Sequence, residues 1–281
     1  MIIQTSNHPL VESLPAPRQQ QLSALRNWLL QQSAVVVAYS GGVDSTLVAA
    51  LAAEQLADRA EAVTGVSPAL APSLLQEARW QAQWLGMRHR EILTQELNDI
   101  NYSSNPENRC YFCKKELHGL LTKISGTFLV LDGVNQDDQA DHRPGLQAAA
   151  EHGVASPLLQ FGIDKQGVRE ISRALGFPWW DKPAQPCLAS RFPYGEPVSA
   201  NRLQRVAKAE EILRGFGFSQ LRVRCQGDTA RIELLPADLV QLLKPKERQE
   251  LVSQFLALGF TAVSVDLEGL VSGKLNRSLL Q

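Results

Sequence analysis

The sequence predicts an α/β fold with a parallel sheet that has helices on both faces, followed by a smaller α+β domain. Strand-like and helix-like segments alternate through residues 1–177, and this alternation requires crossover connections between parallel strands. A glycine-rich turn joins the first strand to its helix. After Gly176, five prolines fall within twenty residues and interrupt regular structure, so we place a domain boundary there and assign residues 178–281 to the second domain.

Hydrophobic patterns place the individual elements. In the first domain we expect helices at 18–32, 44–56, 73–85 and 112–123, and strands at 34–39, 62–66, 90–93 and 128–134. The valine-rich first strand is typical of a strand buried on both faces. In the second domain we expect helices at 200–213 and 245–258, a hairpin formed by 221–225 and 229–234, and a strand at 262–267.

Composition argues against several classes of protein. The chain carries 28 lysine and arginine residues against 29 aspartate and glutamate residues, and a net charge of -1 gives no basic field for nucleic acid. The amino terminus lacks a secretory signal, and no apolar run is long enough to span a membrane. We therefore expect a cytoplasmic protein that acts on a small molecule, without a nucleic-acid or membrane partner. We also expect a homo-oligomer, although composition alone does not give the oligomeric state.

The strongest local signal is the hexapeptide SGGVDS at residues 40–45, between a buried strand and a helix. Gly41 and Gly42 let the backbone approach an anion, and the first amides of the helix point at it from the positive end of the dipole. Ser40 and Ser45 add hydroxyl donors, and Asp44 is suited to hold Mg²⁺ against phosphates. An ordinary capped Gly-Gly turn is the alternative. The Walker lysine is missing, which excludes a P-loop NTPase.

A second candidate nucleotide segment, residues 132–145, follows the strand expected at 128–134. Four aspartates within ten residues repel each other unless a cation lies nearby. Ligands bind beyond the carboxyl ends of the strands in such sheets. A solvated acidic loop is the alternative, but beside a phosphate loop this segment, with Gly133 and Asp141, is better explained as part of an ATP–Mg²⁺ site.

The four cysteines differ in their surroundings. Cys110 and Cys113 form a CxxC pair at the start of an expected helix, and such a pair serves a disulfide, half a zinc site or part of an iron–sulfur site. Cys187 lies in the proline-rich loop near Arg191, which suits a thiolate or a phosphate. Cys225 lies in a strand pattern and is better explained as a small residue packed within a sheet.

Several segments together resemble the LarE-type sulfur transferases, which act in biosynthesis of the nickel-pincer nucleotide cofactor of lactate racemase. The resemblance runs from about residue 18 and is carried by SGGVDS, NRCYFCKKEL, LDGVNQDDQADHRPG, PCLASRFPYGEPV, RVRCQGDTARIE and DLEGLVSGKLN. SGGVDS resembles the PP-loop of ATP pyrophosphatases. That implies the adenine nucleotide alpha hydrolase fold, with a five-stranded parallel sheet, and cleavage of ATP between its α and β phosphates.

The resemblance also implies a substrate and a set of site residues. The carboxylates of pyridinium-3,5-dicarboxylate mononucleotide would be adenylated and then become thiocarboxylates. The sulfur-donor cysteine matches Cys187, and residues that hold phosphate and substrate match Ser190, Arg191, Arg222 and Arg224. The chemistry is sound by itself, because adenylation turns a poorly leaving oxygen into a good leaving group for attack by sulfur.

Arg222 and Arg224 lie two apart on an expected strand and so face the same side. Arginine forks bind phosphate and carboxylate well, although the residues alone slightly favour a solvated basic face. Glu210 and Asp238 are weaker matches to acidic positions near the family's site.

The family has two branches. In one branch a single cysteine gives up its own sulfur and becomes dehydroalanine, and in the other three cysteines hold a 4Fe-4S cluster whose open iron carries the sulfur. Cys110, Cys113 and Cys187 resemble the second branch, which implies that they are catalytic and bind the cluster. A sacrificial Cys187 without a cluster is the alternative.

Three rival functions have different requirements. A tRNA thiolation enzyme of the PP-loop class would need a basic face or an RNA-binding module, which the net charge of -1 disfavours. A glutamine-dependent amidotransferase subunit would need a glutaminase partner and no set of cysteines. A nucleotide sensor would release no pyrophosphate.

Overall fold

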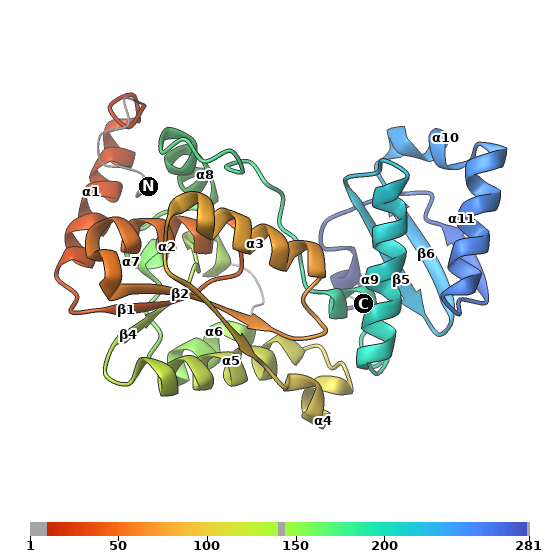
Figure 1. Cartoon of the computed structure of the whole chain (residues 1–281), viewed down its shortest axis with the longest axis horizontal. Helices are drawn as coiled ribbons and strands as arrows, with labels where there is room; N and C mark the ends of the chain where they lie inside the picture. Colours follow the sequence, from red (N-terminus) through yellow and green to blue (C-terminus); the bar gives the residue numbers. More distant parts are fainter. Residues whose placement is uncertain (1–9, 140–143, 280–281) are drawn as a thin grey trace. The chain divides into compact units, whose positions relative to one another are not determined.

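A computed structural model describes residues 10–139 and 144–279, which form two compact units (Figure 1). The described part of the first unit comprises residues 10–67, 72–96, 108–139 and 144–185, and that of the second comprises 68–71, 97–107 and 186–279. Residues 178–185 belong with the first unit because Trp179 packs edge-on against Trp80 and Trp84, with ring centroids 5.2 Å apart in each pair. The functional division at residues 177 and 178 stays a prediction.

A four-stranded parallel sheet forms the centre of the first unit, in the order β3-β2-β1-β4. Its strands are β1 (Val35–Ala38), β2 (Ala60–Val66), β3 (His89–Leu93) and β4 (Leu129–Leu131). Beyond β4, Ala155 forms a single parallel bridge with Leu131. The predicted α/β fold class is confirmed, and in the described residues the fifth strand implied by the PP-loop resemblance is reduced to this bridge.

Helices cover both faces of this sheet because the side chains of β1 alternate between two hydrophobic cores. The helices are α1 (Ala16–Leu30), α2 (Val43–Leu56), α3 (Pro72–Leu85), α5 (Arg109–Ser125), α6 (Pro144–Glu151), α7 (Pro157–Gln160) and α8 (Lys165–Ala174). Val35 and Val37 belong to the core shared with α1, α2, α3 and α8, whereas Val36 and Ala38 pack with Leu121 of α5. Figure 1 shows α5 on the opposite side of the sheet from α2 and α3.

The second unit is built around a three-stranded sheet in the order β5-β6-β7. The strands β5 (Leu221–Gln226) and β6 (Thr229–Leu234) form the predicted antiparallel hairpin, and β7 (Ala262–Val265) pairs parallel with β6. The helices of this unit are α4 (Ile100–Ser103), α9 (Ala200–Gly215), α10 (Leu239–Leu242) and α11 (Pro245–Ala257). Among the described residues, no helix of either unit combines the length and hydropathy needed to cross a bilayer.

Candidate functional site

The hexapeptide 40–45 lies between β1 and α2, and its glycines are required by the local geometry. Gly41 has a φ of +71°, and a Cβ atom there would lie 3.0 Å from the Cβ of Ala78 on α3. Gly42 is the N-cap of α2 and has no side chain that could bond to the first amides of the helix. The positive end of the α2 dipole is therefore left available to an anion.

The two serines of the hexapeptide bond to each other across the loop. Their Oγ atoms lie 3.1 Å apart, and the Oγ of Ser45 accepts from the backbone N of Ser40 at 3.2 Å. The Oγ of Ser40 also accepts from the backbone N of Gly42 at 3.3 Å. Ser45 is buried and Ser40 is exposed, so Ser45 shapes the loop from inside while Ser40 can reach a ligand.

Gly133 brings the second nucleotide segment against the first. A Cβ atom at this position would lie 2.6 Å from the backbone N of Ser45 and 2.8 Å from its Cα atom. Any side chain would push the segment after β4 away from the first turn of α2. Gly133 thus joins the segments that follow β1 and β4, which the sequence predicts to share one nucleotide site.

The acidic segment uses its carboxylates to hold its own backbone. Asp132 accepts from the backbone N of Val134 at 3.1 Å, and Asp138 accepts from that of Asn135 at 3.1 Å. Both aspartates are buried, and burial raises the pKa of Asp132. For these two residues the alternative of a solvated acidic loop is wrong. Asp141 lies outside the described residues.

Asp44 connects the phosphate loop to two other segments. It lies in the first turn of α2, where its Oδ1 accepts from the side-chain amide of Asn135 at 3.0 Å. Its Oδ2 forms an ion pair with Lys165, the first residue of α8, which is 121 positions away in the sequence. The sequence did not predict this lysine at the loop.

A second lysine also reaches the loop. The Nζ of Lys182 lies 3.4 Å from the carbonyl oxygen of Gly41 and 2.6 Å from a carboxylate oxygen of Glu77 on α3. Lys182 is thereby tied to α3 and to the backbone at the glycine turn. The loop that lacks a Walker lysine therefore has two lysines beside it.

In the second unit, Cys187 is half-buried and directly precedes a short helical turn, Leu188–Arg191. The backbone N of Leu188 donates to the carbonyl of Ala69 at 2.8 Å, and that of Ser190 donates to the carbonyl of Cys187 at 3.0 Å. Ser190 is buried, and its Oγ accepts from Arg191 at 3.0 Å. The backbone around the predicted sulfur donor is thus held firmly.

Arg191 is buried, and all three nitrogens of its guanidinium form hydrogen bonds within the second unit. Its Nε and Nη2 atoms bond to the two carboxylate oxygens of Glu210 on α9 at 2.8 and 3.2 Å. Its Nη1 donates to the carbonyl of Pro186 at 2.9 Å. These contacts hold the Cys187 turn against α9, and a role for Arg191 or Ser190 as a phosphate ligand stays a prediction.

Arg224 also holds the turn that contains Cys187. It is buried on β5, where its Nε and Nη2 atoms bond to Glu233 of β6 at 3.0 and 3.1 Å. Its Nη1 donates to the carbonyl of Ser190 at 2.6 Å. The sequence-based preference for a solvated basic face is wrong for Arg224, because packing of the hairpin against the Cys187 turn buries its guanidinium.

Arg222 differs from its two arginine neighbours. It is half-buried, and its guanidinium donates to the carbonyl of Val271 at the long distance of 3.5 Å. Burial, together with the positive charges of Arg191 and Arg224, lowers the pKa of Arg222. A bound anion would relieve this repulsion, and a role for Arg222 in binding a substrate phosphate stays a prediction.

The acidic candidates of the second unit lie in different places. Glu210, besides holding Arg191, accepts from the backbone N of Val223 at 3.2 Å and is 1% exposed as a side chain. It therefore joins α9, β5 and the Cys187 turn. Asp238 is half-buried at the start of α10.

The remaining cysteines match their predicted local structure. Cys110 and Cys113 lie three residues apart in the first turns of α5, so their side chains share one face of the helix, and Cys110 is exposed. Cys225 is fully buried on β5 and its Sγ donates to the carbonyl of Gly227 at 3.3 Å. The interpretation of Cys225 as a packed strand residue is confirmed.

No three His, Cys, Asp or Glu side chains among residues 10–139 and 144–279 come together as a metal-binding group. Cys110 and Cys113 belong to the first unit and Cys187 to the second. The CxxC pair fits two thiolate ligands of a cluster, since both side chains lie on one helix face outside the hydrophobic cores.

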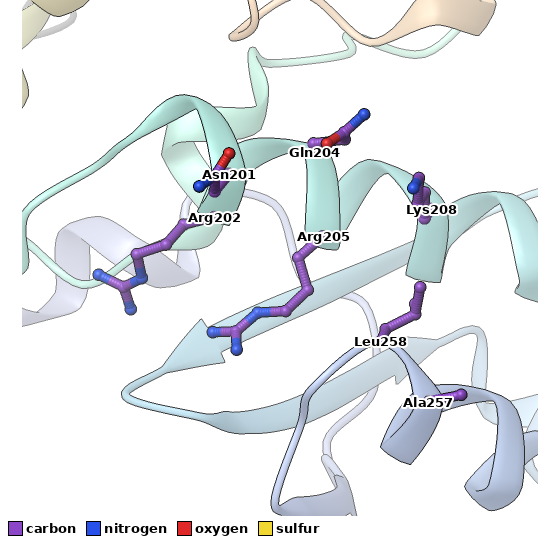
Figure 2. A pocket seen from close by; sticks show the side chains of 7 residues that line it. All are labelled: Asn201, Arg202, Gln204, Arg205, Lys208, Ala257 and Leu258. Atoms are coloured by element: carbon purple, nitrogen blue, oxygen red, sulfur yellow. The ribbon is translucent and has the colours of Figure 1, made fainter.

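A hollow of about 330 Å³ on the second unit carries positive charge but holds none of the predicted site residues (Figure 2). It is lined by Asn201, Arg202, Gln204, Arg205, Lys208, Ala257 and Leu258. Its arginines are already engaged: Arg202 pairs with Glu196, and Arg205 pairs with Asp228 at 2.8 Å. Because both bind the carbonyl of Gly227, they fasten α9 to the hairpin turn.

Comparisons with known proteins agree with this geometry. A family model described as asparagine synthase matches residues 19–104, which include the phosphate loop and the strands β1 to β3. Together with the parallel sheet, this match points to the PP-loop class of ATP-using proteins.

Similarity over the whole chain narrows the class. The chain is 36% identical over 249 residues to the pyridinium-3,5-bisthiocarboxylic acid mononucleotide synthase of Lactiplantibacillus plantarum, covering 87% of this chain and 90% of that protein. It is 52% identical over 262 residues to an uncharacterized protein of Synechocystis, covering 92% of this chain and 98% of the relative. An uncharacterized protein of Methanocaldococcus jannaschii is 31% identical over 237 residues, with coverage of 83% and 89%. The chain belongs to the LarE-type family of ATP-dependent sulfur transferases.

Proposed function

We propose that this protein adenylates the carboxylates of pyridinium-3,5-dicarboxylate mononucleotide and converts them to thiocarboxylates in nickel-pincer nucleotide biosynthesis, as part of lactate racemase maturation. The observation that carries the proposal is the 36% identity, over most of both chains, to the bisthiocarboxylic acid mononucleotide synthase. The phosphate loop and the Cys187 turn supply the two functions that such chemistry needs.

The first step takes place at the phosphate loop. A carboxylate oxygen of the substrate attacks the α-phosphorus of ATP, and pyrophosphate leaves. The amides at the start of α2 and the hydroxyl of Ser40 hold the departing phosphates, and Asp44 would hold Mg²⁺, which would neutralise part of their charge. The product is a mixed anhydride whose carbonyl carbon is a good electrophile.

The second step takes place with the residues of the second unit. A sulfur nucleophile attacks the carbonyl carbon, AMP leaves with its electron pair, and a thiocarboxylate results. Arg222 binds the phosphate of the mononucleotide, since its charge has the least internal compensation among the three neighbouring arginines. Arg191 and Arg224 keep the backbone around Cys187 in one position.

Cys110, Cys113 and Cys187 would hold a 4Fe-4S cluster. When bound, such a cluster would supply an exchangeable iron site for sulfide, so that turnover need not consume Cys187. The surface position of the CxxC pair supports this proposal, because neither thiol is needed to fill a core.

Cysteine variants test the proposal and its alternative. We expect anaerobically purified protein to absorb near about 400 nm, as thiolate-bound clusters do. The double variant Cys110→Ala/Cys113→Ala should lose this band and multiple turnover, and Cys187→Ala should lose sulfur transfer but still release pyrophosphate. Cys225→Ala is the matched control and should keep the absorbance band, multiple turnover, sulfur transfer and pyrophosphate release.

Two outcomes would overturn parts of the proposal. Full sulfur transfer by the Cys110 and Cys113 double variant, with Cys187 lighter by one H₂S in mass spectrometry, would place the protein in the sacrificial branch. If the wild-type protein releases no pyrophosphate from ATP with the dicarboxylate mononucleotide, the proposed reaction itself is wrong. Thiolation of tRNA in the same assay would favour the rival enzyme.

A further inference from the structure

The phosphate loop has no cationic side chain of its own to offset the negative charge of a bound nucleotide. ATP and pyrophosphate bring several negative charges to a hexapeptide that contains one carboxylate, Asp44, and no lysine or arginine. Like charges at this spacing repel strongly where water is partly excluded. Mg²⁺ held by Asp44 would offset part of this charge, and because the hexapeptide has no cationic side chain, further positive charge would come from another part of the chain.

Lys165 lies where such a cation is needed. Its ammonium group forms an ion pair with Asp44, and the two side chains are 29% and 21% exposed, so both can be reached by a ligand. The other oxygen of Asp44 accepts from Asn135 at 3.0 Å. Through its ion pair with Asp44, the ammonium of Lys165 places a positive charge at the first turn of α2.

The backbone of Lys165 is fixed independently of its side chain. Its backbone N donates to Asp137 at 3.0 Å, and Asp164 caps α8 by accepting from the backbone N of Gly167 at 2.7 Å. Arg18 of α1 pairs with Asp164 at 2.8 Å. The ammonium can consequently change partners while the start of α8 stays in place.

We propose that Lys165 is a catalytic residue that exchanges Asp44 for the phosphates of ATP and then of pyrophosphate. This inference rests on the proposed function. When MgATP enters, Asp44 turns to the metal ion, and the ammonium of Lys165 is released to bind phosphate oxygens. No bond is made or broken in the exchange, and the positive charge stays beside the departing pyrophosphate. Lys182, held by Glu77 and by the carbonyl of Gly41, is a positioning residue instead.

Equilibrium binding separates this role from a structural ion pair. Lys165→Met should weaken binding of MgATP and of magnesium pyrophosphate by roughly 10- to 100-fold, as expected for loss of one charged hydrogen bond. Binding of AMP, which lacks those phosphates, should change less than about twofold. Lys165→Arg should recover part of the lost affinity, and Lys123→Met, at an exposed lysine on α5, should change nothing.

Asp44→Asn gives a second test that works in the opposite direction. Without Mg²⁺, this variant should bind pyrophosphate more tightly than the wild-type protein, because Lys165 no longer has a carboxylate partner. Adding Lys165→Met to Asp44→Asn should remove the gain. If the ion pair is only structural, any gain comes from loss of the Asp44 charge alone and should remain when Lys165→Met is added.

The outcomes distinguish this inference from the proposed function. The role of Lys165 would be overturned if wild type and Lys165→Met bind pyrophosphate with equal affinity, or if the variant loses as much affinity for AMP as for ATP. The proposed function would still stand in that case, provided that the wild-type protein converts the dicarboxylate mononucleotide. If the wild-type protein neither binds MgATP nor releases pyrophosphate, the proposed function fails first. If Lys165→Met does not fold, the affinity of Asp44→Asn for pyrophosphate without Mg²⁺ tests the proposal instead. An affinity no higher than that of the wild-type protein would contradict the exchange of partners by Lys165.

Discussion

The phosphate loop and the Cys187 turn are held in place by opposite means. At the loop, Gly41 and Gly133 make close backbone contacts, and the charged pair formed by Asp44 and Lys165 remains partly exposed. At the turn, Arg191 and Arg224 are buried and each is paired with a carboxylate that is at most 1% exposed. The first arrangement leaves polar groups free to exchange partners, and the second does not.

This difference suits the two proposed tasks. A loop that binds ATP and releases pyrophosphate needs donors that change partners at small cost. A cysteine that takes part in sulfur transfer must stay at a fixed position, and a buried ion pair gives that rigidity because breaking it leaves an uncompensated charge. Substitutions in the two regions should therefore fail in different ways.

The largest effect is expected from Glu210→Gln, which should lower the stability of the second unit and so tests whether buried ion pairs hold the Cys187 turn. It leaves the buried charge of Arg191 uncompensated, and such a change costs about 3–5 kcal/mol. Denaturant unfolding measured by far-ultraviolet circular dichroism should show the loss. Tryptophan fluorescence should change less, because all five tryptophans lie in the first unit. A matched control is Glu91→Gln, which disrupts the exposed pair with Arg79 and should leave stability unchanged.

Normal stability with lost sulfur transfer in Glu210→Gln would contradict this assignment. Glu210 would then act on the substrate, as its weak match to an acidic family position suggests, and the Cys187 turn would have another support.

Asp44→Asn should show the opposite behaviour, with a large loss of activity and little loss of stability. Removing a ligand of Mg²⁺ withdraws charge stabilisation worth several kcal/mol, so pyrophosphate release should fall on the order of 100-fold or more. The ion pair with Lys165 is partly exposed, so its loss should shift the unfolding midpoint little. Unchanged pyrophosphate release in a coupled assay would show that Asp44 does not hold the metal ion.

The sequence predicted the local structure of the phosphate loop, between a buried strand and a helix, because all of its determinants are local. Glycines, hydroxyls and the start of α2 lie within six consecutive residues, so their roles follow from spacing. Lys165 was missed because 121 positions separate it from Asp44, and only the packed fold brings them together. A signal for its helix did exist, since Asp164 is an N-cap residue followed by apolar residues at Val168 and Ile171.

The site of the second unit was predicted less completely. The resemblance to the LarE-type family pointed to Arg191 and Arg224 as residues that hold a ligand. The structure shows that each has a buried carboxylate partner, Glu210 or Glu233, on a neighbouring element. Spacing along the sequence contains no information about such tertiary pairs, so the distinction between Arg224 and Arg222 required the structure.

Arg222→Ala should affect binding of the mononucleotide specifically. Loss of a charged hydrogen bond to phosphate costs about 1.5–3 kcal/mol, which corresponds to a roughly 10- to 100-fold rise in the KM for the mononucleotide. The KM for ATP should stay unchanged. Arg224→Ala serves as the contrast, because it leaves Glu233 buried without its partner and should lower stability as well. If only the KM for ATP rises in Arg222→Ala, Arg222 belongs to the ATP site.

The smallest effect is expected at His118 in the first unit. Unlike the paired arginines of the second unit, this residue is buried without a hydrogen-bond partner among the described residues. His118 of α5 is fully buried, and within the described residues neither ring nitrogen has a hydrogen-bond partner. Burial, followed by the charges of Lys114 and His152, lowers the pKa of His118 to about 3. The imidazole is therefore neutral in the folded protein across the working range of pH, whereas the unfolded chain takes up a proton below about 6.5.

The sign of the pH dependence follows from these two values. As the pH falls from about 6.5 toward 3, the unfolded state binds a proton that the folded state does not, so stability is lost throughout that window. At pH 5 the loss from His118 should reach about 2 kcal/mol. His118→Leu removes this contribution and also removes two unpartnered nitrogens from the interior. Urea unfolding followed by tryptophan fluorescence at pH 7 and pH 5 should show a smaller difference for the variant than for the wild type. Equal differences would mean that the folded protein protonates His118 as readily as the unfolded chain does.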